Sequence, residues 1–216
     1  MSIEYLFGLP VLKTKIDPTE YNKDVIVKDI LENYEKDSTR NVWEKYDSIN
    51  VKSRLHHSFN DPDPKFKRID YSDLVPVYEQ KIAQQLQTLQ WKNDFSFEFT
   101  IENYTCIKEN HYMREHAHPW TDFTAVHYVK FDPKQHFSTV YVNTHDYADY
   151  AKDLAVGSYN HLDTGTTAGS YMNSHYSLNT DEDDFVITPS FVKHSVPFHE
   201  KCSDHRITIA LNIIIK

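Results

Sequence analysis

The chain has 216 residues, 39% of them hydrophobic, and a formal net charge of −9 at pH 7, which predicts one globular domain with a sizeable core. The acidic balance argues against a nucleic-acid partner, and the presence of only two cysteines argues against a disulfide scaffold. No apolar run or signal-peptide pattern occurs, so we expect a cytoplasmic protein with no membrane attachment. A bias toward Lys, Asn, Ile and Tyr is typical of an AT-rich genome such as a viral one, in which case the compartment is the host cytoplasm.

The first part of the chain predicts one strand and two helices. Residues 3–13 read as a strand interrupted by Gly8 and Pro10. Asp17 and Pro18 then indicate the start of a helix. Asp73 is expected to cap a second helix that runs to Trp91. Apolar residues recur at helical spacing in both segments: Ile26, Val27, Ile30, Leu31 and Tyr34, then Leu74, Val77, Ile82, Leu86 and Leu89.

From residue 95 the pattern changes to short strands, predicted at 95–109, 112–118, 124–131, 137–145, 184–189 and from Arg206 to the end of the chain. Helices followed by strands favour a mainly β fold, an antiparallel sandwich or barrel braced by N-terminal helices. We expect a single domain, 1–216, in which residues 1–94 supply a strand and supporting helices and 95–216 form the barrel core. The polar region 143–180 is either a lid at a substrate entrance or a solvated connection, and the acidic run 181–184 is expected to be a solvated turn.

A pattern of histidines in the second half suggests a metal site. His116 and His118 are two residues apart, so on an extended strand they point to the same face. His194, from a distant strand, would complete a facial triad that leaves half of the coordination sphere open. Three imidazoles suit zinc, iron, copper or nickel. A chain with thirteen histidines also produces such a pair without a metal.

Arg206 and Thr208 lie just past the third histidine. Residues 206, 208, 210 and 212 share one face of the last strand, so both side chains are expected to point into one cavity. The opposite face, residues 207, 209, 211 and 213, is expected to pack against the outer shell. A guanidinium here suits an acidic co-substrate. The alternative is a surface ion pair of Arg206 with Asp204 or Asp183.

The stretches HAHPWTDFTAVHYV and ITPSFVKHSVPFHEKCSDHRITIALN resemble the core of the Fe(II)/2-oxoglutarate-dependent oxygenases, and within them the prolyl-hydroxylase-like group and its bacterial and phage relatives. The resemblance implies a double-stranded β-helix (jelly-roll, cupin-like) core, with Fe(II), 2-oxoglutarate and O2 as cofactor and co-substrates. It also implies hydroxylation of a peptidyl or small-molecule substrate, with release of succinate and CO2.

The resemblance assigns a role to each matching residue. It makes His116, His118 and His194 the iron ligands, Arg206 the partner of the far carboxylate of 2-oxoglutarate, and Thr208 and Tyr128 the hydroxyl groups beside that carboxylate. His118 departs from the family, which usually has an acid in its place. Asp122 is the alternative ligand if a turn after Pro119 brings it inward, and His111 is a weaker candidate because its spacing has the opposite parity.

Two other classes remain open on the sequence. A cupin-type metalloenzyme would use the histidines without a keto acid and would give Arg206 and Thr208 no role. A non-catalytic β-sandwich binding protein would carry the histidines on its surface and bind no metal. The sequence does not identify the substrate, and a homodimer is possible because exposed sheet edges are often covered by a neighbour.

Overall fold

The computed structural model describes residues 2–6, 8–41, 53–58, 63–143 and 174–216. Its first element is a hairpin in which β1 (Ser2–Leu6) pairs antiparallel with β2 (Leu9–Lys15). Gly8 has a φ of 80°, a left-handed conformation that glycine adopts without steric cost. The single interrupted strand predicted at 3–13 is therefore wrong: the glycine reverses the chain instead of merely breaking the strand.

A capping box follows. The Asp17 carboxylate accepts a hydrogen bond from the Thr19 N–H at 2.9 Å, and the Glu20 carboxylate accepts one from the Asp17 N–H at 3.2 Å. These bonds begin only a short 3-10 turn, η1 (Pro18–Glu20), and the α-helix α1 (Lys23–Lys36) starts after it. The predicted helix is thus divided into two elements.

The second helix, α2 (Leu74–Leu86), is shorter than predicted and is not capped by Asp73. The Asp73 carboxylate instead accepts a hydrogen bond from the side chain of Asn22, which joins the starts of the two α-helices. Leu89 and Trp91 lie beyond the helix but still pack against the core. Among the described residues, no helix is long and apolar enough to cross a membrane.

The strands form two antiparallel sheets, which agrees with the predicted mainly β fold. The larger sheet has the order β1-β2-β9-β6-β11-β4-β3 and the smaller one β5-β10-β7-β8. In the larger sheet, the remaining strands are β3 (His56–His57), β4 (Phe97–Ile107), β6 (Phe123–Lys130), β9 (Asp184–Pro189) and β11 (Arg206–Ile215). The smaller sheet contains β5 (Met113–His116), β7 (Val140–Val142), β8 (His175–Ser177) and β10 (His194–Val196).

Several strand boundaries differ from the expected ones. β5 ends at His116 rather than 118, and β7 covers only three residues of the predicted 137–145 strand, whose last two residues lie outside the described part of the chain. The short strands β3, β8 and β10 were not predicted. The segment before residue 95 contributes β1, β2 and β3 to the larger sheet as well as the two helices.

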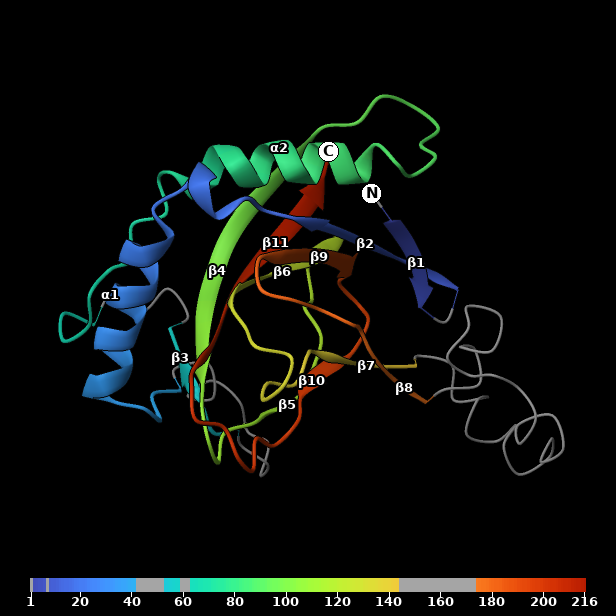
Figure 1. Cartoon of the computed structure of the whole chain (residues 1–216). Helices are drawn as coiled ribbons and strands as arrows, with labels where there is room; N and C mark the ends of the chain where they lie inside the picture. Colours follow the sequence, from blue (N-terminus) through green and yellow to red (C-terminus); the bar gives the residue numbers. More distant parts are fainter. Residues whose placement is uncertain (1, 7, 42–52, 59–62, 144–173) are drawn as a thin grey trace, which may run out of the picture.

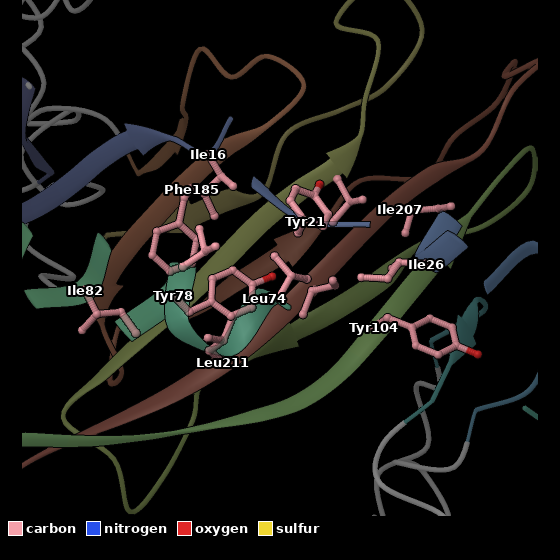
Figure 2. Close-up of a cluster of buried hydrophobic side chains, with 14 of the residues drawn as sticks. Ile16, Tyr21, Ile26, Leu74, Tyr78, Ile82, Tyr104, Phe185, Ile207 and Leu211 are labelled. Atoms are coloured by element: carbon pink, nitrogen blue, oxygen red, sulfur yellow. The ribbon is translucent and has the colours of Figure 1, made fainter. Parts of the chain in front are cut away.

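Both helices cover the outer face of the larger sheet, and the smaller sheet lies on its other side (Figure 1). The apolar face of β11, formed by Ile207, Ile209, Leu211 and Ile213, is buried against helix residues such as Ile26, Leu74 and Tyr78 (Figure 2). Burial of each such aliphatic side chain stabilises the fold by about 1.5–3 kcal/mol. This packing fixes β11, so its alternate residues point toward the smaller sheet.

A second apolar cluster lies between the two sheets and includes Val11, Tyr128, Tyr141, Val186 and Val192. This second cluster holds the two sheets face to face, whereas the first holds the helices on the larger sheet. The space that remains between the sheets is lined by the polar residues described next.

Candidate metal centre

The three histidines of the predicted triad come together at one end of the smaller sheet. His116 is the last residue of β5 and His194 the first of β10, and the two are directly paired across these antiparallel strands. His118 lies beyond β5, so the two histidines do not share a regular strand, although their rings converge as expected. Its backbone N–H donates to the carbonyl of Ser190 at 3.0 Å, which fixes the loop beside the triad.

Each of the three rings offers one ligand atom, and these atoms lie within 4.8 Å of one another. The Nδ1 atoms are already engaged: that of His116 with the Arg114 carbonyl at 3.1 Å and that of His194 with the Val192 carbonyl at 2.9 Å. Nδ1 of His118 lies 2.8 Å from Oδ1 of Asn212. Because all three partners are acceptors, each Nδ1 carries the proton and each Nε2 keeps a lone pair, the arrangement that metal-binding histidines use.

The electrostatics of the triad also favour a metal ion. Burial, together with the neighbouring rings, lowers the pKa of His194 to about 4. Burial likewise lowers the pKa of His116 and of His118 below the ordinary value. All three rings are therefore neutral near pH 7, the protonation state that a metal requires.

Arg206 is a buried cation, 1% exposed, that lies between the sheets. Its Nε donates to the carbonyl of Phe137 at 3.0 Å, and its terminal nitrogens lie 3.4 Å from the hydroxyls of Thr208 and Thr139. Burial lowers the pKa of the guanidinium, since its neighbours are neutral. Within the described residues it pairs with no carboxylate.

The surface ion pairs considered for Arg206 do not form. Asp204 binds Lys130 at 2.6 Å, and Asp183 binds Lys23 at 2.6 Å. A buried charge without a counterion is costly, and an anionic ligand would offset that cost. Arg206 is therefore a candidate anion-binding group.

One pocket of about 470 Å³ of empty space, partly open to solvent, connects the triad to Arg206. Its other polar lining residues are His57, Asn103, Thr105, Thr124, Thr139 and Thr208, and its apolar ones are Met113, Ala125, Val126, Val196 and Ala210. The distal cation and the open face of the triad thus belong to the same cavity. Such an arrangement can hold a metal ion at one end and an acidic ligand that reaches toward the other.

Tyr128 does not line this cavity but contacts Thr139, which does. Its hydroxyl donates to Thr139 Oγ1 at 3.0 Å and accepts from the Thr139 N–H at 3.1 Å, while its ring lies 5.3 Å from the guanidinium carbon of Arg206. Thr208 forms a 2.7 Å hydrogen bond with Thr105.

The two alternative ligands lie elsewhere. Asp122 is exposed, and its Oδ2 accepts a hydrogen bond from the Ile215 N–H at 2.8 Å. His111 is buried, with its Nδ1 3.3 Å from the Lys108 N–H. Among the described residues, the histidine triad is the one group of His, Cys, Asp or Glu side chains with metal-binding proximity.

Of the other predicted features, most of region 143–180 lies outside the described residues, although its end contains β8. The acidic run 181–184 forms a turn, in which Asp183 has a φ of 66° and Glu182 also binds Lys23, at 2.7 Å.

Sequence reasoning missed four residues that line the pocket, His57, Asn103, Thr105 and Thr139. It also missed Asn212, which forms a hydrogen bond with the candidate metal ligand His118. The alternation within β4 indicated that Asn103 and Thr105 share a face, but nothing in the sequence indicated that β4 pairs with β11. For His57 no signal beyond the residue type exists.

No family model matches the sequence, and no curated protein matches it significantly. Solved structures do match. A prolyl-4-hydroxylase from Pseudomonas putida is 12% identical, with 94% of this chain and 91% of the other covered and a TM-score of 0.50. The prolyl hydroxylase from Trichoplax adhaerens, in complex with a peptide fragment of the hypoxia inducible factor oxygen degradation domain, is 7% identical, with 94% and 83% covered and a TM-score of 0.51.

A third match is SnoK, a non-heme, alpha-ketoglutarate-dependent carbocyclase from nogalamycin biosynthesis. It is 12% identical, with 95% of this chain and 79% of the other covered and a TM-score of 0.53. All three are oxygenases with the double-stranded β-helix fold. This chain therefore has that fold, as the sequence predicts.

Proposed function

We propose that this protein is an Fe(II)- and 2-oxoglutarate-dependent dioxygenase that hydroxylates a peptidyl or small-molecule substrate and releases succinate and CO2. The observation that carries the proposal is a single pocket with three neutral histidines at one end and, at the other, a buried arginine that has no carboxylate partner in the described part of the chain. The fold that the chain shares with known oxygenases of this kind adds support.

The donor set fits a divalent iron. His116, His118 and His194 would hold it through Nε2, because each Nδ1 already donates a hydrogen bond. Bound Fe(II) would supply the activation of O2, coupled to oxidative decarboxylation of the keto acid. The triad has no carboxylate, so a metal dication keeps its full charge of +2. The near carboxylate of the co-substrate would offset one unit of that charge, and the far carboxylate would pair with Arg206.

Arg206 would hold the far carboxylate of 2-oxoglutarate. A planar guanidinium offers two parallel N–H donors to a carboxylate, and low dielectric strengthens such a pair. Phe137 fixes the guanidinium through its backbone carbonyl, while Thr139 and Thr208 present hydroxyls beside it. Tyr128 positions Thr139 through two hydrogen bonds. A cupin-type metalloenzyme without a keto acid would leave the buried charge of Arg206 without a role.

The walls of the pocket would exclude water from the reacting centre. Met113, Val196, Val126 and Ala210 supply an apolar surface between the triad and Arg206. A radical or a strongly oxidising centre needs such shielding, because solvent access permits side reactions.

An anaerobic titration of Fe(II) into the metal-free protein, with and without 2-oxoglutarate, tests the proposal. We expect a weak visible charge-transfer band only when both are present. Iron binding without this band would favour a metalloenzyme that uses no keto acid. Absence of metal binding would refute an enzymatic role for the triad.

A further inference from the structure

Asn103 is the part of the pocket that the proposed function leaves unexplained. It lies on β4, lines the cavity and is 9% exposed. The other neutral side chains with which it could be compared are engaged: Thr105 binds Thr208 at 2.7 Å, and Thr124 binds Thr188 at 3.3 Å. The Oδ1 of Asn103 is buried and has no hydrogen-bond partner among the described residues.

The local backbone places Asn103 between the two ends of the pocket. It is paired with Ala210 of β11, two residues along the strand from the Thr105–Thr208 pair. The pairing then shifts, because Leu211 lies opposite Ile101 and Glu102 is left as an extra residue. Such bulges redirect side chains and occur next to active sites. Ala210, opposite Asn103, adds only a methyl group to this part of the wall.

A buried amide oxygen without a partner destabilises the protein. Where such an oxygen lines a pocket, a bound ligand can supply the missing hydrogen bond. An oxygen acceptor requires an N–H or O–H donor from that ligand.

The charges around the pocket further limit which chemical groups the ligand can carry. Apart from Arg206, which the keto acid would neutralise, no Lys, Arg, Asp or Glu among the described residues lines the pocket. His57 is neutral as well, because burial lowers its pKa to about 3. A free ammonium group would therefore be desolvated in this space without a counter-charge.

We propose that Asn103 positions the primary substrate, by accepting a hydrogen bond from a neutral donor such as an amide N–H, and so selects amide-bearing substrates over free amino acids. This inference rests on the proposed function, because the reacting carbon must lie near the triad. Met113 and Val196, on the opposite wall, would contact the apolar part of the substrate.

The test uses Asn103→Leu, which keeps the size and removes the acceptor, and Thr124→Val as the matched control at another lining position. The protein is loaded with Co(II) and 2-oxoglutarate, and binding of N-acetyl amino-acid N-methylamides and of the free amino acids is followed in the visible cobalt spectrum. We expect a subset of the blocked amides to bind the wild type. Asn103→Leu should weaken that binding at least tenfold, and Thr124→Val less than threefold.

Unchanged binding by Asn103→Leu, preference for the free amino acids, or failure of every blocked amide to bind would overturn the assignment. Failure of the wild type to bind 2-oxoglutarate with metal would instead refute the proposed function. A thermal melt of the metal-free protein tests whether Asn103 instead has a structural role. Asn103→Leu should raise the midpoint by a few degrees, since it removes an unpaired buried acceptor, and a fall of several degrees would show that Asn103 supports the fold.

Discussion

The Nδ1 atom of His118 lies 2.8 Å from Oδ1 of Asn212, and this bond joins a loop to β11, an interior strand of the larger sheet. Asn212 is on β11, on the strand that also carries Arg206 and Thr208. The apolar face of the same strand is anchored against both helices. One strand therefore orients a candidate metal ligand and supplies the candidate anion-binding group.

This relationship predicts a loss of metal affinity when Asn212 is changed. Asn212→Ala removes the acceptor that fixes the ring orientation and tautomer of His118, so Fe(II) or Zn(II) affinity should fall about 10- to 100-fold. Competition with a chromophoric chelator measures this metal affinity. Asn212→Asp, which keeps an acceptor, serves as the control and should bind at least as tightly as the wild type. Equal affinity in Asn212→Ala and the wild type would show that the bond has no role in metal binding.

A second prediction distinguishes His118 from Asp122 as the third ligand. Asp122 is exposed and its carboxylate caps the Ile215 N–H, so Asp122→Ala should leave metal affinity within about twofold of the wild type. His118→Ala should lower it more than 100-fold, because one of three ligands is removed. Metal analysis after dialysis against a chelator compares the two variants directly. Retention of metal by His118→Ala together with its loss in Asp122→Ala would reverse the assignment.

Arg206 is expected to act on the keto acid and not on the metal. Arg206→Gln removes the buried positive charge, so the dissociation constant for 2-oxoglutarate should rise between about 30-fold and several thousand-fold, the range for one lost partner of a buried charge pair. Arg206→Lys keeps the charge but loses the planar fork, and we expect an intermediate effect. Calorimetric titration of the metal-loaded protein measures both variants. Loss of metal binding in Arg206→Gln would contradict this role.

Much of this site could be predicted because it depends on alternation along single strands. The two-residue period of β11 separates Arg206 and Thr208 from the apolar face, and the structure has that separation. The limits of the strand were also readable, because the segment from Arg206 onward is uniformly apolar on one face. Mainly β architecture follows from the same patterns.

What the sequence could not predict depends on tertiary contacts. Pro119 has no N–H for a strand ladder, so β5 ends before His118, and contacts with Ser190 and Asn212 fix that loop. Asp73 is a residue type that often caps helices, but its carboxylate binds Asn22. The roles of Asn103 and His57 follow from which strands pair and in what register, and a single sequence does not specify that pairing.

Acid should destabilise the protein through its buried histidines. Burial lowers the pKa of His127 to about 3, and the ring is fully buried beside Tyr78, whose hydroxyl lies 2.9 Å from its Nδ1. Between pH 6.5 and 3 the unfolded chain binds a proton at this position and the folded chain does not, so the free energy of unfolding falls as the pH falls. Above pH 6.5 the ring is neutral in both states and contributes no pH dependence.

Urea unfolding of the metal-free protein at several pH values measures this effect. His127→Phe should reduce the slope of unfolding free energy against pH near pH 5 by about 1.4 kcal/mol per unit, the contribution of one proton. Lys13→Gln, at a position whose ammonium donates to the carbonyl of Asn179, is the control and should keep the wild-type slope. An unchanged slope in His127→Phe would mean that this histidine is protonated in the folded protein.

The last prediction concerns Trp120, which lies two residues after His118 with a φ of 70° and 92% of its surface exposed. A left-handed backbone costs a residue with a Cβ about 1–2 kcal/mol, whereas glycine avoids that cost but loses about 0.5–1 kcal/mol through the greater freedom of the unfolded chain. Since the indole is almost unburied, Trp120→Gly should be as stable as the wild type or up to about 1.5 kcal/mol more stable. Trp120→Ala removes the indole and keeps the strain, so it should be the less stable of the two variants in urea unfolding. If the glycine variant were clearly less stable than the alanine one, the indole-bearing loop would be unstrained. If Trp120→Gly is more stable than both Trp120→Ala and the wild type, the loop beside the triad retains an exposed aromatic ring at a net cost in stability. Strained residues at ligand-binding sites commonly carry such a cost.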